Sequence, residues 1–190
     1  MSELNRWVVA ISLLCCGAVG LSVSARQQKV NPDAQLLQDF KQRVDNYMEL
    51  HNRAEKKGPA LKETDDPAKI KASQEALATS IRAARANARQ GEIFTPEVAQ
   101  LFRRLMYPEI KGPDGAETKK VIKDDAPAAI TLKVNAKYPE NAPLPTVPPN
   151  LLANLPQLPK DLEYRIVHRD LILRDVHANL IVDFIPKAIR

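Results

Sequence analysis

The fold is decided by the last part of the chain, residues 162–185, which read LEYRIVHRDLILRDVHANLIVDFI. Three runs in this stretch, 162–168, 171–175 and 180–185, are rich in β-branched, aliphatic and aromatic residues, and turn-forming residues separate them at 169–170 and 177–179. Short apolar runs bounded in this way are typical of antiparallel strands. The stretch therefore predicts a three-stranded antiparallel β-meander within residues 161–190.

One face of this predicted meander carries most of its large apolar side chains. We expect the buried face to consist of Tyr164, Ile166, Leu171, Leu173, Leu180, Val182 and Phe184. A sheet this small is only marginally stable by itself. It therefore requires helices, or another chain, to cover it.

Helices are predicted upstream, in residues 26–125, because asparagine, aspartate or threonine is followed by proline at three positions. Asn31-Pro32, Asp66-Pro67 and Thr95-Pro96 each pair a capping side chain with a proline suited to the first helical turn. We expect the first helix to end at Gly58, the second at Gly91 and the third at Pro108. A weaker fourth helix is expected over residues 116–123.

The first two predicted helices have apolar stripes and are joined by a short polar link. Leu37, Phe40, Val44 and Tyr47 recur at helical spacing in the first, and the second has a narrower stripe of small residues. Consecutive helices of this kind commonly fold back on each other. We therefore expect an antiparallel helical hairpin, with the third helix as its lid.

A proline-rich connector, residues 126–160, links the helices to the meander. Eight of the fifteen prolines of the chain fall within residues 127–159, so we expect an extended path with at most a short helical turn at 150–154. The connector also carries many aliphatic residues, which solvated linkers lack. It is therefore expected to lie along a surface, of this protein or of a partner. Together these elements predict an α+β fold.

The first 25 residues have the pattern of a secretory signal peptide. An uncharged run from Trp7 to Val23 follows a short polar start, and small residues precede a cleavage site after Ala25. Retention of this segment as a membrane anchor and lipidation at Cys15 or Cys16 are the alternatives. Since these are the two cysteines of the sequence, a chain cleaved after Ala25 has no thiol and no disulfide. We expect export to the periplasm or the medium.

The charge of the exported chain is modestly positive. Removal of residues 1–25 leaves 27 Lys and Arg against 22 Asp and Glu, so the net charge stays at +5. Such an excess suits an envelope protein or an anionic surface as a partner, or simply keeps the protein soluble. Nucleic acid is not expected as a partner of an exported protein. A membrane partner is expected only through an uncleaved signal segment.

Arginines are concentrated in the second and third predicted helices. Arg82, Arg85 and Arg89 fall on one side of the second helix, and Arg103 and Arg104 follow in the third. Their guanidinium groups are suited to phosphate or carboxylate, which predicts a face for an anionic partner. The alternative is that cations near the end of a helix complement its dipole.

The turns of the meander carry the residues best suited to a metal ion. His168, Asp170, Asp175 and His177 offer the nitrogen and oxygen ligands of zinc. However, the two turns lie at opposite ends of the middle strand, roughly 16 Å apart at 3.3 Å per residue, so one ion cannot bridge them. We therefore expect exposed turn residues and no cofactor.

Catalytic motifs do not emerge from the sequence. His168-Arg169-Asp170-Leu171 matches the first letters of a kinase catalytic loop, but the other kinase motifs are missing from the chain. Neither the nucleophile-elbow pattern of hydrolases nor the paired-histidine motif of zinc proteases occurs. His51 ends the apolar stripe of the first helix, and we interpret it as a boundary residue.

The chain resembles a group of uncharacterised exported bacterial proteins. The resemblance rests on residues 162–167 and 170–189, on Asn31-Pro-Asp-Ala and on Pro145-Thr-Val-Pro-Pro-Asn-Leu-Leu. It implies a protein of the bacterial envelope and no particular activity. We expect a binding or scaffold protein without catalysis. The alternative is a periplasmic enzyme, or a carrier of a small ligand or metal, with its site between the meander and the helices.

Overall fold

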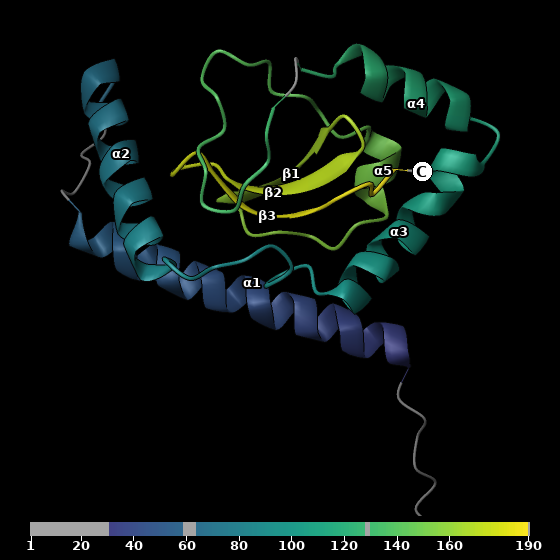
Figure 1. The fold of residues 1–190 in the computed structure, drawn as a ribbon, viewed down its shortest axis with the longest axis horizontal. Helices are drawn as coiled ribbons and strands as arrows, with labels where there is room; N and C mark the ends of the chain where they lie inside the picture. The colour runs from purple at the N-terminus through teal and green to yellow at the C-terminus, as the bar shows by residue number, and fades with distance from the viewer. Residues whose placement is uncertain (1–30, 59–63, 128–129, 190) are drawn as a thin grey trace, which may run out of the picture.

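Helices surround a small sheet in the computed structural model, which describes residues 31–58, 64–127 and 130–189. The predicted signal peptide lies outside these residues. The elements are α1 (Pro32–Lys57), α2 (Pro67–Ala84), α3 (Pro96–Lys111), α4 (Gly115–Asp124), α5 (Pro149–Ala153), β1 (Leu162–Val167), β2 (Asp170–Asp175) and β3 (Leu180–Ile185). The sheet is antiparallel with strand order β1-β2-β3, which confirms the α+β class (Figure 1).

The long helices begin where their capping residues predict. The side-chain oxygen of Asn31 accepts a hydrogen bond from Asp33 N at 3.0 Å, and that of Asp66 accepts one from Ala68 N at 3.0 Å. Thr95 Oγ1 accepts from Val98 N at 3.3 Å in the same way. These bonds satisfy backbone donors that have no partner inside the helix, which is why α1, α2 and α3 start at the following prolines.

Two helix ends differ from the sequence-based expectation. α2 ends at Ala84 instead of reaching Gly91, because the backbone N–H groups of Gly91, Ile93 and Phe94 all donate to Asp183 of β3. α3 continues through Pro108 to Lys111, and its C-cap is Gly112. An internal proline removes one hydrogen bond and crowds the carbonyl one turn earlier, and the burial of Met106 and Ile110 on either side of Pro108 offsets this cost.

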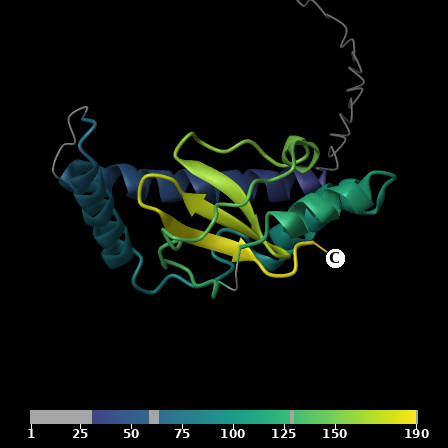
Figure 2. The same ribbon diagram turned by 90° about the horizontal axis from the view of Figure 1, so that it is seen from above.

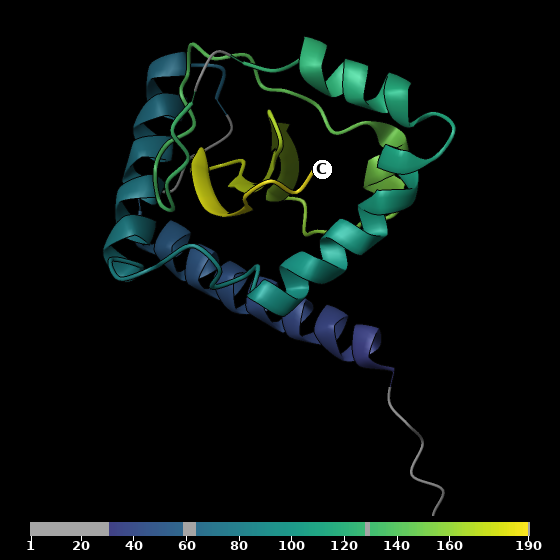
Figure 3. The ribbon, with the colours of Figure 1, turned by 45° about the vertical axis from the view of Figure 1, so that its right-hand side comes forward.

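The first two helices pack on each other, but not along their whole length. Figures 1 and 3 show α2 rising away from α1 at a steep angle, whereas an antiparallel hairpin was expected. The buried residues of α2 are confined to its C-terminal half, at Leu77, Ala78 and Ile81, whereas Ile70 is exposed. The apolar stripe of α1 is free to cover the sheet because α2 contacts only part of that helix.

The main core lies between the sheet and the helices. Its centre is a group of rings: Phe40 of α1 packs against Phe94 and Phe102, and Phe102 in turn meets Tyr164 of β1. This core includes residues of α1, α2, α3, the connector and all three strands. The helical, connector and meander regions of the sequence therefore share one core.

Because of a β-bulge in β3, the buried face of the meander differs from the predicted one. Leu173 pairs with Asp183 and Arg174 pairs with Ile181, which leaves Val182 without a partner in β2. The extra residue shifts the alternation of side chains by one position. Phe184 consequently packs on the far face of the sheet, and Asp183 faces the helices in its place.

The connector covers the far face of the sheet and then crosses to the helical side (Figure 2). Its first part packs Ile130, Leu132 and Tyr138 against Ile172 and Ile181. Asn135 N donates to Ile181 O at 2.8 Å, and Ile181 N donates to Ala136 O at 2.9 Å, so the connector also protects the edge of β3. Val147, Leu151 and Leu155 then join the main core. The connector lies on this protein itself.

Candidate metal centre

Three side chains of α1 form a row that runs toward the end of the sheet. Tyr47, His51 and Glu55 are spaced four residues apart, which places them one above another on the same helix face. Tyr47 and His51 are buried, and Glu55 is exposed near the C-terminal end of the helix. The row therefore passes from the core to the surface.

Asp175, the last residue of β2, meets this row from the sheet. Its Oδ2 accepts a hydrogen bond from Tyr47 Oη at 2.7 Å and lies 2.7 Å from His51 Nδ1. Its Oδ1 accepts a hydrogen bond from Ala178 N at 2.7 Å. Asp175 is fully buried, with no exposed surface, and these three donors supply the hydrogen bonds that a buried carboxylate needs.

The hydrogen bonds around Asp175 keep its carboxylate ionised. Burial alone would raise the pKa of Asp175, but the hydrogen bonds from His51, Ala178 and Tyr47 outweigh it and lower the pKa. Burial alone would lower the pKa of His51, but Asp175, assisted by Glu55 and Asp161, raises it. Because an ionised carboxylate can only accept, His51 Nδ1–H is the donor.

The other ring nitrogen of His51 is left without a partner. Nε2 of this histidine is buried, and within residues 31–58, 64–127 and 130–189 it has no hydrogen-bond partner. The ring lies 5.9 Å from the ring of His177, centroid to centroid. A buried nitrogen without a partner is costly, so a water molecule, an ion or another ligand at Nε2 would stabilise the site.

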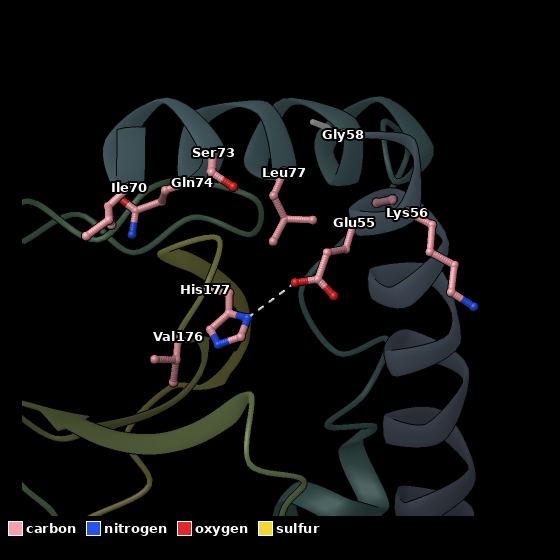
Figure 4. A pocket seen from close by; sticks show the side chains of 10 residues that line it. Glu55, Lys56, Gly58, Ile70, Ser73, Gln74, Leu77, Val176 and His177 are labelled. Carbon is pink, nitrogen blue, oxygen red and sulfur yellow. Dashed lines mark ion pairs between the residues drawn. The ribbon is translucent and has the colours of Figure 1, made fainter. Parts of the chain in front are cut away.

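His51, Glu55 and His177 can offer three ligand atoms that all lie within 4.8 Å of one another. Figure 4 shows Glu55 of α1 and His177 of the β2–β3 loop pointing toward each other, with Nδ1 of the histidine 3.7 Å from Oε1 of the glutamate. Ligands bound tetrahedrally at zinc, with bonds of about 2.0–2.2 Å, are spaced about 3.4 Å apart. Small movements of the exposed Glu55 and His177 side chains would therefore close the group around an ion.

Each histidine of this group also contacts a carboxylate through the ring nitrogen that faces away from the proposed ion. His51 donates through Nδ1 to Asp175, and His177 Nε2 lies 3.5 Å from Asp161 Oδ1. Histidines that bind metals usually contact a carboxylate or carbonyl through the second nitrogen, which orients the ring and makes it a better ligand. Two histidines and one carboxylate suit zinc or a similar divalent transition-metal ion more than magnesium or calcium, which prefer oxygen ligands.

The structure divides the four metal candidates predicted from sequence between the two ends of the sheet. His177 belongs to the new group, and Asp175 supports it through His51. His168 is exposed in the β1–β2 turn at the opposite end, where Asp170 Oδ1 accepts a hydrogen bond from Lys187 N at 2.7 Å. His51 and Glu55 were not predicted as ligands, although the spacing His-x-x-x-Glu places both side chains on one helix face.

Most arginines of the predicted face form hydrogen bonds or ion pairs within the protein. Arg82 donates to Asn135 O and so holds the connector, whereas Arg85 donates to Val182 O and Asn135 Oδ1 and so holds both β3 and the connector. Arg103 donates to Pro186 O, and Arg104 pairs with Asp33. Arg89 is exposed in the turn that follows α2. These five residues therefore do not form one continuous anionic-partner face.

Comparison with protein-family models, with curated proteins and with solved structures gives no match for this chain. Among the helices that the structure describes, none combines the length and the apolar character needed to cross a bilayer.

Proposed function

We propose that this protein is an exported binding protein for a divalent transition-metal ion, with zinc as the best match. The single observation that carries the proposal is the buried, unpartnered Nε2 of His51 beside Glu55 and His177. Asp175 and Asp161 contact the other ring nitrogens of His51 and His177 and so orient the two rings. A site of this kind lies between the meander and the helices.

Two features of the sequence favour a docking module, namely the apolar residues of the connector and the group of arginines. In the structure, both make contacts mainly within this protein. The apolar residues of the connector pack largely on the sheet, and most of the arginines bond to the connector, to β3 or to the residues that follow β3. Metal binding therefore has the stronger support. Export is supported by the signal-peptide pattern. An intact mass that matches a chain beginning at Arg26 would verify cleavage of the signal peptide. A mass that matches a chain with residues 1–25 still attached would contradict it.

Metal binding is tested by calorimetric titration of untagged, metal-stripped protein with Zn²⁺. We expect one ion per chain, and no comparable binding of Mg²⁺. His177→Ala should weaken Zn²⁺ binding at least tenfold because it removes one of three protein ligands.

His168→Ala is the matched control, because His168 is an exposed histidine at the far end of the sheet. It should leave the affinity for Zn²⁺ unchanged. Equal loss of affinity in the two variants, or no loss in His177→Ala, would contradict the proposed site.

A further inference from the structure

The three proposed protein ligands do not complete the coordination of a zinc ion. Zinc commonly takes four ligands, and zinc sites with three protein ligands keep the fourth position for water or another molecule. Among the residues described by the structure, no fourth His, Cys, Asp or Glu belongs to the group. Asp161 and Asp175 contact the outer nitrogens of the histidines and are not free to bind the ion as well.

A cavity of about 550 Å³, within the usual size range of small-molecule sites, lies beside two of the three proposed ligands. Glu55 and His177 line one side of the cavity, and α2 forms the opposite wall. Residues 70, 73, 74 and 77 of that helix are spaced so that they share one face. In Figure 4, Leu77 and Ser73 point from α2 toward Glu55 and His177.

The lining indicates which chemistry the cavity accepts. Ala54, Ile70, Leu77 and Val176 provide aliphatic surface, whereas Ser73 and Gln74 provide hydrogen-bonding groups. Lys56 also borders the cavity, but its ammonium group points away in Figure 4. Among the described residues that line the cavity, no lysine or arginine head group therefore faces an anion bound at the metal ion, and without the ion that anion meets the negative charge of Glu55.

We propose that the metal-loaded protein binds a small aliphatic carboxylate, with the carboxylate oxygen on the open position of the ion and the chain against Ile70, Leu77 and Val176. This inference rests on the proposed metal function and adds its ligand class. It requires that carboxylate binding depend on the ion, and that a longer chain bind more tightly than the head group alone.

The test uses untagged full-length protein loaded with Co²⁺, whose visible absorption responds to changes in its ligands. Hexanoate should shift the cobalt bands at lower concentration than acetate, by a factor of about ten, since burial of each methylene contributes about 0.8 kcal/mol and part of the chain remains exposed. Hexanol should produce no shift because it lacks the carboxylate. The metal-free protein should not bind hexanoate in calorimetry.

Ile70→Asn provides the matched variant, because Ile70 is 45% exposed and can be replaced without opening the core. It should weaken hexanoate binding about fivefold while the affinities for acetate and Co²⁺ stay the same. Co²⁺ binding without any band shift from hexanoate would overturn the open position and leave metal binding intact. Equal affinity for acetate and hexanoate would overturn the aliphatic part, and failure to bind Co²⁺ would overturn the proposed function itself.

Discussion

His51 of α1 and Asp175 of β2 are 124 residues apart in the chain, yet Nδ1 of the first lies 2.7 Å from Oδ2 of the second in the core. This contact ties the longest helix to the central strand. It also fixes which nitrogen of His51 remains available for an ion. The same pair of residues therefore serves the stability of the fold and the proposed metal centre.

Replacement of this carboxylate should affect both properties. Asp175→Asn is expected to lower the free energy of unfolding by about 3 kcal/mol, because one oxygen that accepts buried hydrogen bonds becomes a donor. The affinity for Zn²⁺ should fall about 10–100-fold through loss of the support to His51. Urea denaturation and zinc calorimetry measure the two effects. Asp170→Asn, at the other end of β2, should leave zinc affinity unchanged; an equal loss there would contradict the assignment.

Asp183 should matter for stability alone. Its two carboxylate oxygens accept hydrogen bonds from the backbone N–H groups of Gly91, Ile93, Phe94 and Phe184. Asp183→Asn presents a donor to these donors, so we expect the free energy of unfolding to fall by about 2–4 kcal/mol. Faster hydrogen exchange at Ile93 and Phe94 would locate the effect. Zinc affinity should be unaffected, and a large loss of it would show that the two aspartates are not independent.

Glu163 should make the stability of the sheet depend on pH. Burial alone would raise its pKa, but hydrogen bonds from Arg165 and Arg174 outweigh it and lower the pKa below the ordinary 4.5. The stabilisation is therefore complete above pH 4.5 and is lost as the pH falls through the lower pKa of the folded state. Glu163→Gln should cost about 1 kcal/mol at pH 7 and progressively less below pH 4.5.

The control variant for Glu163→Gln is Glu49→Gln, which changes an exposed glutamate of α1. It should alter the free energy of unfolding by no more than about 0.5 kcal/mol at either pH. Denaturant titrations at pH 7 and pH 3.5 measure both variants. A deficit of Glu163→Gln that is the same at the two pH values would argue against the role of its charge.

Arg85 and Arg89 should behave differently although the sequence places them on one face. The side chain of Arg85 is only 8% exposed, donates to Val182 O and Asn135 Oδ1, and stacks over the Tyr47 ring. Arg85→Ala should cost about 2 kcal/mol and speed proteolysis of the connector, because its polar partners lose their donor. Arg89→Ala should stay within about 0.5 kcal/mol. Similar costs for both variants would contradict this distinction.

The sequence predicted the elements whose signals are local. Asn31, Asp66 and Thr95 each cap the helix that follows, and the strands and turns of the meander were recognised from their composition. The early end of α2 was not predicted, because its cause is Asp183, which lies about ninety residues further along the chain. The position of Phe184 was missed because a bulge at Val182 interrupts the regular alternation on which the prediction relied.

The sequence by itself determined the class of the fold, since helix caps, apolar spacing and β-branched runs act over a few residues. It also supplied His177 and Asp175 as candidates. Only the tertiary structure decided that the connector lies on the far face of the sheet and that His51, Glu55 and His177 come together. Such contacts depend on which apolar faces cover one another, and a burial energy shared by the whole core leaves no local pattern in the chain.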